Sequence, residues 1–156
     1  MQNFEIERKF LVKKLPPNLD RFPKLEIQQG YIAITHDGTE VRLRQKSSKF
    51  YQTVKNGEGL KRREVEIAIT REQFGKLWPL TEGKRIEKVR YEIAHGAFTI
   101  ELDIYRGALV GLLVAEVEFV SESESQSFMP PKWFGAEVTH DSRYKNKNLA
   151  VHGMPG

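Results

Sequence analysis

Charged and apolar residues alternate along most of this chain, and each alternating stretch carries charges of mainly one sign. In a β-strand, residues two positions apart lie on the same face. The opening stretch EIERKFLV, residues 5–12, therefore places Glu5, Glu7 and Lys9 on one face and mostly apolar side chains on the other. A chain with this pattern is suited to a sheet with one charged face and one apolar face.

The same period of two recurs seven times further along the chain. The expected strands are residues 29–35, 41–46, 51–55, 64–69, 88–93, 98–105 and 112–119. Turn sequences such as HDG and NGEG lie between neighbouring strands, and strands joined by short connections usually pair antiparallel. The sequence therefore predicts about eight strands in an antiparallel sheet or barrel.

Three short helices are expected beside the strands. Residues 70–78 and 121–127 each begin with Thr or Ser followed three residues later by Gln or Glu, the pattern of a capping box. A last helix is expected from about residue 142 to residue 151, with Asp141 as its N-cap and Gly153 as its terminator.

Length and composition favour one globular domain covering residues 1–156. Hydrophobic residues make up 39% of the 156 residues and charged residues 29%, which is enough for one sizeable core. The absence of cysteine excludes disulfides and thiolate metal sites. We expect a cytoplasmic protein, because no stretch has the pattern of a signal peptide or the length of a membrane span.

The charges are segregated by strand in a way that an ordinary solvated sheet face would not need. Such a face remains the simpler interpretation of any single pair. However, like-charged neighbours cost stability unless an opposite charge lies between them. Acid pairs suit divalent cations, and rows of Arg and Lys suit phosphates. A sheet closed with this face inward would form a polar tunnel for a metal-chelated polyphosphate. The acid pairs are Glu5 and Glu7, Glu64 and Glu66, Glu101 and Asp103, and Glu116 and Glu118, and the basic pairs are Arg42 and Arg44, and Lys88 and Arg90.

The opening stretch has the form ExExK and resembles the signature of the CYTH superfamily, also called triphosphate tunnel metalloenzymes. The later motifs follow in the order of that family: RLR at 42–44, Lys55 in TVK, EVE at 64–66, EKVR at 87–90, ELD at 101–103, EVEF at 116–119 and RYKN at 143–146. Residues 133–150 and the short length look most like the bacterial inorganic triphosphatases. The resemblance implies an α+β fold that is mainly antiparallel β, a closed eight-stranded β-tunnel with a few helices packed outside.

The resemblance also implies roles for individual residues. The expected ligands of Mg²⁺ or Mn²⁺ are Glu5, Glu7, Asp103, Glu116 and Glu118. The expected triphosphate clamp is Lys9, Arg42, Arg44, Lys55, Lys88, Arg90, Arg143 and Lys145. Glu116 or Glu118 is expected to activate an in-line water, and Lys88 to stabilise the departing charge. Glu64 and Glu66 are expected to hold basic residues in position or to help with the metal.

The expected function is metal-dependent hydrolysis of inorganic triphosphate to diphosphate and phosphate. A class IV adenylate cyclase, a thiamine triphosphatase and a non-enzymatic polyphosphate-binding module remain as alternatives. The expected partner is a small-molecule triphosphate. Nucleic acid is not expected, because the basic rows alternate with aliphatic rather than aromatic residues, and neither is a membrane. The choices between monomer and homodimer and between Mg²⁺ and Mn²⁺ stay open.

Overall fold

A computed structural model describes residues 6–57 and 63–156 of the chain. Nine strands form one antiparallel sheet in the order β5-β4-β3-β2-β6-β7-β8-β1-β9. The strands are β1 (Ile6–Val12), β2 (Lys24–Ile34), β3 (Glu40–Lys46), β4 (Lys49–Asn56), β5 (Arg63–Ile69), β6 (Arg85–His95), β7 (Phe98–Tyr105), β8 (Leu113–Phe119) and β9 (Phe134–Glu137). The eight strands expected from the alternation are all present, so the antiparallel fold is confirmed.

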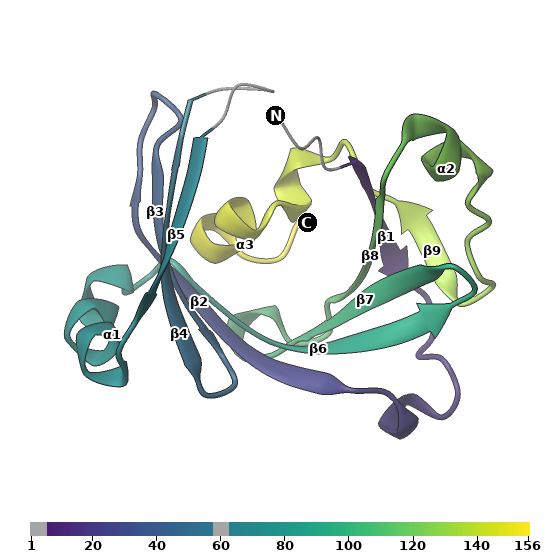
Figure 1. The fold of residues 1–156 in the computed structure, drawn as a ribbon, viewed down its shortest axis with the longest axis horizontal. Coiled ribbons are helices and arrows are strands. Elements are labelled where there is room, and N and C mark those ends of the chain that lie inside the picture. Colours follow the sequence, from purple (N-terminus) through teal and green to yellow (C-terminus); the bar gives the residue numbers. More distant parts are fainter. Residues whose placement is uncertain (1–5, 58–62) are drawn as a thin grey trace.

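The sheet curls strongly, so that β3, β4 and β5 stand across from β1, β8 and β9 (Figure 1). The strand order ends at β5 and at β9, and no ladder joins these two edges within residues 6–57 and 63–156. The expected tunnel is thus a curled sheet of nine strands, without hydrogen-bonded closure in the described part. The ninth strand, β9, escaped the sequence analysis because its four residues, FGAE, are too few to show a period.

The helices largely follow the expected boundaries. Helix α1 (Arg71–Leu77) begins with the capping box that the sequence predicts, since Thr70 and Gln73 bond each other's backbone N–H. In α2 (Glu122–Ser127) the N-cap serine accepts a hydrogen bond from the backbone N–H of Glu124. Short 3₁₀ turns lie at η1 (Leu19–Arg21), η3 (Trp78–Thr81) and η4 (Gly107–Leu109).

The expected last helix is divided in two. Asp141 caps the 3₁₀ turn η5 (Ser142–Tyr144), and the chain then becomes extended at Lys145 before α3 (Asn146–His152) begins. The terminator is as expected, because Gly153 ends α3 with a positive φ of 78°. No helix in the described part of the chain is long and apolar enough to cross a membrane.

Helix α3 lies inside the curl of the sheet and not outside it (Figure 1). Leu149 of α3 is buried in a cluster with Ile86 and Tyr105. The hydroxyl of Tyr105 also donates a hydrogen bond to Asn146 Oδ1 at 2.7 Å. These contacts hold the C-terminal segment against the charged side of the sheet, so the expectation that the helices pack outside is wrong for α3.

Most apolar side chains face the convex side, where other elements cover them. Phe10 of β1 packs in the largest core cluster with Phe128 and Phe134, which follow α2. Leu43 and Phe50 pack beneath Phe74 of α1 in a second cluster. Burial of these faces turns the charged faces of the same strands toward the inside of the curl.

Edge strand β5 departs from this arrangement. The alternation of residues 64–69 places Val65 and Ile67 on the apolar face of this strand, which should be buried, but they are 59% and 51% exposed. The reason is that α1 does not extend over these two positions of the edge strand. Only Ile69 of this row joins the cluster under α1.

Candidate active site

The strand register brings the charged rows of the sheet onto one continuous surface. Residues directly opposite each other on paired strands point to the same face. Glu7 of β1 is opposite Glu118 of β8, and Lys9 is opposite Glu116. Glu116 is in turn opposite Glu101 of β7. The charged residues that alternate along each strand are therefore neighbours of charged residues on the adjacent strands.

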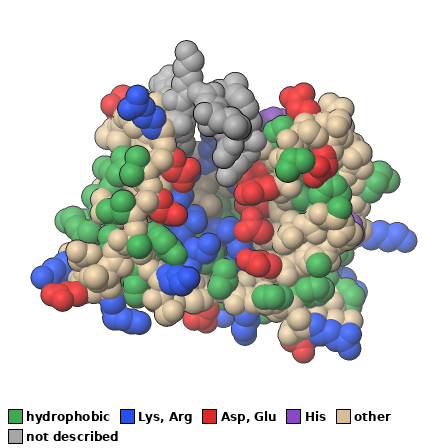
Figure 2. Space-filling model, in the orientation of Figure 1, with side chains coloured by type: hydrophobic (Ala, Val, Ile, Leu, Met, Phe, Trp, Pro, Cys, Tyr) green, Lys and Arg blue, Asp and Glu red, His purple; other side chains and the backbone are tan. Residues whose placement is uncertain are grey.

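This charged surface lines a cavity of about 380 Å³ inside the curl. In Figure 2 the hollow has basic side chains in its floor and a column of acidic side chains along one rim. Among the described residues, the basic lining consists of Lys9, Arg42, Arg44, Lys55, Arg90, Lys145 and Lys147. The acidic lining consists of Glu7, Glu40, Glu64, Glu101, Glu116 and Glu118. Most of the predicted site residues are thus gathered around one space.

Three arginines form the centre of the basic wall. The pKa of Arg44 is lowered to about 10, mainly by burial and also by the neighbouring positive charges of Arg42 and Arg90. The guanidinium of Arg42 is buried, and its Nε has no hydrogen-bond partner among the described residues. Like charges held this close repel each other, so an anion in the cavity would stabilise the wall.

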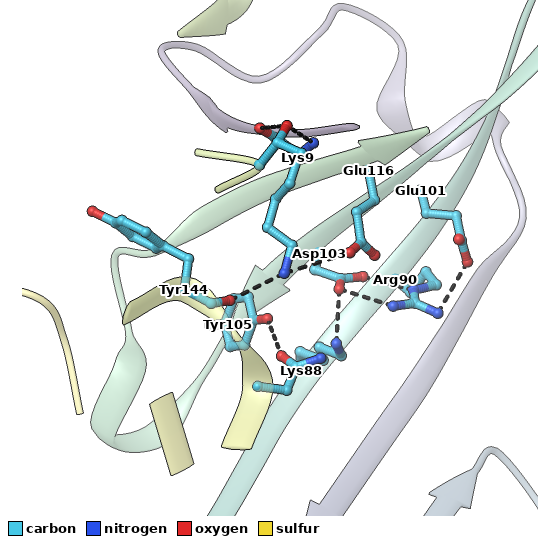
Figure 3. A network of polar contacts seen from close by, with 10 residues as sticks. Lys9, Lys88, Arg90, Glu101, Asp103, Tyr105, Glu116 and Tyr144 are labelled. Carbon is cyan, nitrogen blue, oxygen red and sulfur yellow. Dashed lines mark hydrogen bonds and ion pairs between the residues drawn. The ribbon is translucent and has the colours of Figure 1, made fainter. Parts of the chain in front are cut away.

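Asp103 of β7 is the hub of a buried ion-pair network behind this wall (Figure 3). Its two oxygens accept hydrogen bonds from Arg90 Nε at 2.8 Å and Arg90 Nη2 at 3.0 Å. Lys88 Nζ lies 2.8 Å from Asp103 Oδ2. Burial alone would raise the pKa of Asp103, but these two cations lower it to about 2.

The same network orients Arg90 and places Lys88 out of contact with solvent. Burial opposes the charge on Arg90, but hydrogen bonds and ion pairs with Asp103 and Glu101 raise its pKa above the ordinary value. The Nη1 of Arg90 lies 2.9 Å from Glu101 Oε2. Burial lowers the pKa of Lys88 to about 8, with Arg90 and Arg44 adding to the effect and Asp103 opposing it. Lys88 can therefore change its charge at mildly alkaline pH.

The acidic wall comes from β1, β7 and β8. Burial raises the pKa of Glu101, and neighbouring Glu116 adds to the rise. Lys9 Nζ donates a hydrogen bond to the carbonyl of Tyr144 at 3.1 Å and lies 3.5 Å from Glu116 Oε1 (Figure 3). Lys9 thus joins the acidic wall to the segment that precedes α3.

The acidic wall has the oxygen donors that Mg²⁺ and Mn²⁺ prefer. Glu7, Glu116 and Glu118 line the cavity from adjacent positions on β1 and β8. No group of three or more His, Asp or Glu side chains within the described residues is disposed to hold a metal ion. Glu5, the remaining predicted carboxylate of this wall, lies outside the described residues. In its chemistry the wall fits a divalent cation.

Asp103 does not lie where a metal ligand was expected. It is 4% exposed, and it is absent from the cavity lining. Because Lys88 and Arg90 engage both of its oxygens, the structure places it behind the arginine wall as their counter-ion. Lys88, also a predicted contact, lies in the same buried layer and not on the cavity surface.

The structure does not bring Arg143 to the cavity either. Its guanidinium donates hydrogen bonds to both carboxylate oxygens of Asp141. Its backbone N–H also donates a hydrogen bond to Asp141 Oδ1. It lines a different hollow beside the C-terminal residues. The 3₁₀ turn η5 explains this result, because it directs Arg143 away while Lys145 and Lys147 face the cavity.

Several residues of this site were missed by the sequence analysis. Lys147 Nζ lies 3.8 Å from Glu40 Oε2, which links α3 to the start of β3. Tyr31 also lines the cavity, and buried Gln29 bridges it to Arg44. The period of two places Gln29 and Tyr31 on one face, but only the pairing of β2 with β3 shows that this face carries the arginines.

Comparison with known proteins gives a consistent result over nearly the whole chain. Residues 3–153 match the CYTH domain. An inorganic triphosphatase of Nitrosomonas europaea is 48% identical over 149 residues, covering 94% of this chain and 97% of the relative. An inorganic triphosphatase of Acetivibrio thermocellus is 38% identical over 151 residues, covering 93% and 92%.

Solved structures agree with the sequence relatives. The crystal structure of an inorganic triphosphatase superimposes with a TM-score of 0.81 at 45% identity, covering 98% of this chain and 97% of that one. The curled antiparallel sheet is therefore shared with this relative. The chain belongs to the CYTH domain family.

Proposed function

We propose that this protein hydrolyses inorganic triphosphate to diphosphate and phosphate, with Mg²⁺ or Mn²⁺ as cofactor. The observation that carries the proposal is the convergence of Arg42, Arg44 and Arg90 on a cavity that Glu7, Glu116 and Glu118 also line. Close sequence relatives named inorganic triphosphatase support the same reaction.

The balance of charges in the cavity supports a divalent cation. Seven basic and six acidic side chains line the cavity among the described residues. A polyphosphate would be attracted by the first set and repelled by the second. A cation between the acidic wall and the phosphate would remove this repulsion, and Mg²⁺ commonly bridges one or two carboxylates to substrate phosphates. Glu7, Glu116 and Glu118 would hold it.

Catalysis in this site would rest on positioning and electrostatic stabilisation, as in other phosphoryl transfers. The planar forks of Arg42, Arg44 and Arg90 suit contacts to phosphate oxygens. Glu116 or Glu118 would orient a water in line with the scissile bond. The bound metal would supply positive charge to the phosphate oxygens. Lys88, held by Asp103, would add a buried positive charge behind the departing group.

The described cavity favours an inorganic substrate over the alternatives. A nucleoside or thiamine moiety would need an apolar or aromatic platform, yet the described lining is polar or charged apart from Tyr31. Tyr31 is only 2% exposed and is hydrogen-bonded at its hydroxyl. A cyclase or a thiamine triphosphatase is therefore a weaker interpretation. A polyphosphate-binding module without catalysis fits the basic wall but gives no role to the acidic one.

The test is phosphate release from inorganic triphosphate, ATP and thiamine triphosphate, measured in parallel with Mg²⁺, with Mn²⁺ and with EDTA. We expect metal-dependent release from inorganic triphosphate at least tenfold faster than from the other two. Absence of release from all three substrates would overturn the proposed reaction. Release that persists in EDTA would overturn the metal dependence alone.

We further propose a cytoplasmic location and leave the oligomeric state to measurement. A small-molecule polyanion as substrate is consistent with that location, and cell fractionation followed by immunoblotting tests it. Light scattering coupled to size-exclusion chromatography would distinguish a monomer from a homodimer.

A further inference from the structure

Gln29 lies fully buried on β2 behind the arginine wall, and the reaction proposed above assigns it no role. Its Oε1 accepts a hydrogen bond from Arg44 Nε at 2.7 Å. Its Nε2 donates a hydrogen bond to the hydroxyl of Tyr31 at 2.9 Å. Arg44 and Tyr31 both line the cavity. A single buried amide therefore connects two groups that would face a bound phosphate.

Chemistry fixes the direction of both hydrogen bonds. A guanidinium has donors only, so the oxygen of Gln29 must face Arg44. The NH₂ group of the amide must then face Tyr31, whose hydroxyl oxygen acts as the acceptor. The proton of that hydroxyl is consequently directed away from Gln29. Among the described residues, the hydroxyl's partners are the amide of Gln29 and the guanidinium of Arg42, and both act as donors, so neither takes this proton.

We propose that Gln29 is a positioning residue that makes Tyr31 a hydrogen-bond donor to a phosphate oxygen of the substrate. The same amide holds the guanidinium of Arg44 in the orientation that faces the cavity. This inference rests on the proposed function, because it requires a phosphate group in the cavity. Phosphate oxygens are acceptors, so a hydroxyl with an available proton complements them and a lone pair repels them.

The energetics of burial support a role beyond packing. A buried amide is costly unless its polar groups are bonded. The residue two positions earlier on the same face, Ile27, is apolar and equally buried. An aliphatic side chain at position 29 would fill space without any requirement for partners. The amide instead pairs with two groups of the cavity, which gives it a directional function.

The decisive variant is Gln29→Glu, which keeps the shape of the side chain and reverses its hydrogen-bonding. A carboxylate accepts from Arg44 and also accepts from Tyr31, so the tyrosine proton turns toward residue 29. Loss of one oriented donor to a developing charge commonly costs on the order of 100-fold in rate. We expect kcat/KM for inorganic triphosphate to fall by about that factor.

Two controls separate this effect from added charge or lost stability. Gln28→Glu makes the same chemical change on the exposed, opposite face of β2, and it should leave kcat/KM within about twofold. Gln29→Met removes the polarity without adding charge and leaves the Tyr31 hydroxyl free to rotate. Its loss should be smaller than that of Gln29→Glu, and it serves as the test variant if the glutamate variant does not fold.

A double-mutant cycle with Tyr31→Phe tests the role of the hydroxyl itself. If Gln29 acts through Tyr31, the effect of Gln29→Glu must shrink at least several-fold in the Tyr31→Phe background. An equal effect in both backgrounds would overturn the inference, because the loss would then come from charge or packing alone. Wild-type activity in both Gln29 variants would overturn it as well.

Binding measurements keep this test separate from the proposed reaction. Calorimetric titration with inorganic triphosphate in EDTA measures affinity without turnover, and the cycle can be repeated on the Kd values. If wild type binds inorganic triphosphate but does not hydrolyse it, the proposed reaction fails. Coupling between Gln29→Glu and Tyr31→Phe in the Kd values would then still support the positioning role of Gln29. If wild type neither binds nor hydrolyses, both the proposed function and this inference fail.

Discussion

Glu7 on β1 stands directly opposite Glu118 on β8, so two carboxylates face the cavity from hydrogen-bonded strands. Like charges placed directly opposite each other destabilise a sheet. The arrangement is favourable when a cation binds beside them. The proposed metal site rests on this pair together with Glu116, and it can be tested independently of catalysis.

Replacement of Glu118 by Gln should weaken metal binding. The variant keeps the size of the side chain and removes one anionic ligand, so we expect the affinity for Mn²⁺ to fall on the order of 10–100-fold. Calorimetry or the rise in Tm with added Mn²⁺ measures this change. Glu82→Gln, an exposed change away from the cavity lining, is the control and should bind Mn²⁺ as wild type does. Equal affinities for all three proteins would refute the site.

Replacement of Asp103 by Asn should be strongly destabilising. The change leaves Lys88 and Arg90 without their shared buried counter-ion. Breaking a buried ion pair on one side typically costs about 3–5 kcal/mol. Urea unfolding followed by circular dichroism measures the difference.

The matched control for Asp103 is Asp141→Asn, which weakens an exposed ion pair with Arg143. Exposed ion pairs contribute little to stability because solvent screens them, and Asn is also a good helix cap. We expect a small loss for this variant. A loss for Asp103→Asn no larger than that for Asp141→Asn would contradict the assigned role of the buried network.

Lys88 should make stability depend on pH in the alkaline range. Its folded-state pKa is lowered to about 8 from 10.5, so the unfolded chain binds the proton more tightly between these values. The free energy of unfolding should therefore rise with pH across this window. The contribution of Lys88 to that free energy is fully present above pH 10.5 and is lost as the pH falls through 8. In a Lys88→Met variant this dependence should disappear.

The measurement is the free energy of unfolding in urea at several pH values from 7.5 to 10.5, compared between wild type and variant. The difference, wild type minus Lys88→Met, should rise with pH. Lys76→Met is the control, since Lys76 is exposed on α1 and should give a difference that does not change with pH. A flat difference for both variants would show that Lys88 titrates as an ordinary lysine.

Gly30 should not tolerate even a methyl group. A Cβ built at this position would lie 2.6 Å from Cβ and Oγ1 of Thr81, which is fully buried where η3 crosses β2. We expect Gly30→Ala to cost about 1–3 kcal/mol in the free energy of unfolding. Thermal and urea unfolding both measure this loss.

The control for Gly30 is Gly75→Ala in α1, where a new Cβ meets nothing within 4 Å. Alanine is favoured over glycine inside a helix by about 1 kcal/mol, so this variant should be as stable as wild type or more stable. If the two alanine variants behaved alike, the close approach of η3 to β2 would not be tight in solution.

The sequence predicted the main architecture because its signals are local. Period-two alternation identified eight of the nine strands, and capping boxes identified the start of α1 and of α2. The alternation also predicted which charged residues share a face. Strand β9 and the break at Lys145 were missed, since four residues show no period and a single extended residue leaves no pattern.

The alternation by itself determined that the charged residues of each strand share one face, because in a strand the position in sequence sets the face. It could not determine which charge would meet which, since that depends on register between distant strands. Only the tertiary structure buried Asp103 between Lys88 and Arg90 and paired Arg143 with Asp141. Only the pairing of β2 with β3 placed Gln29 against Arg44.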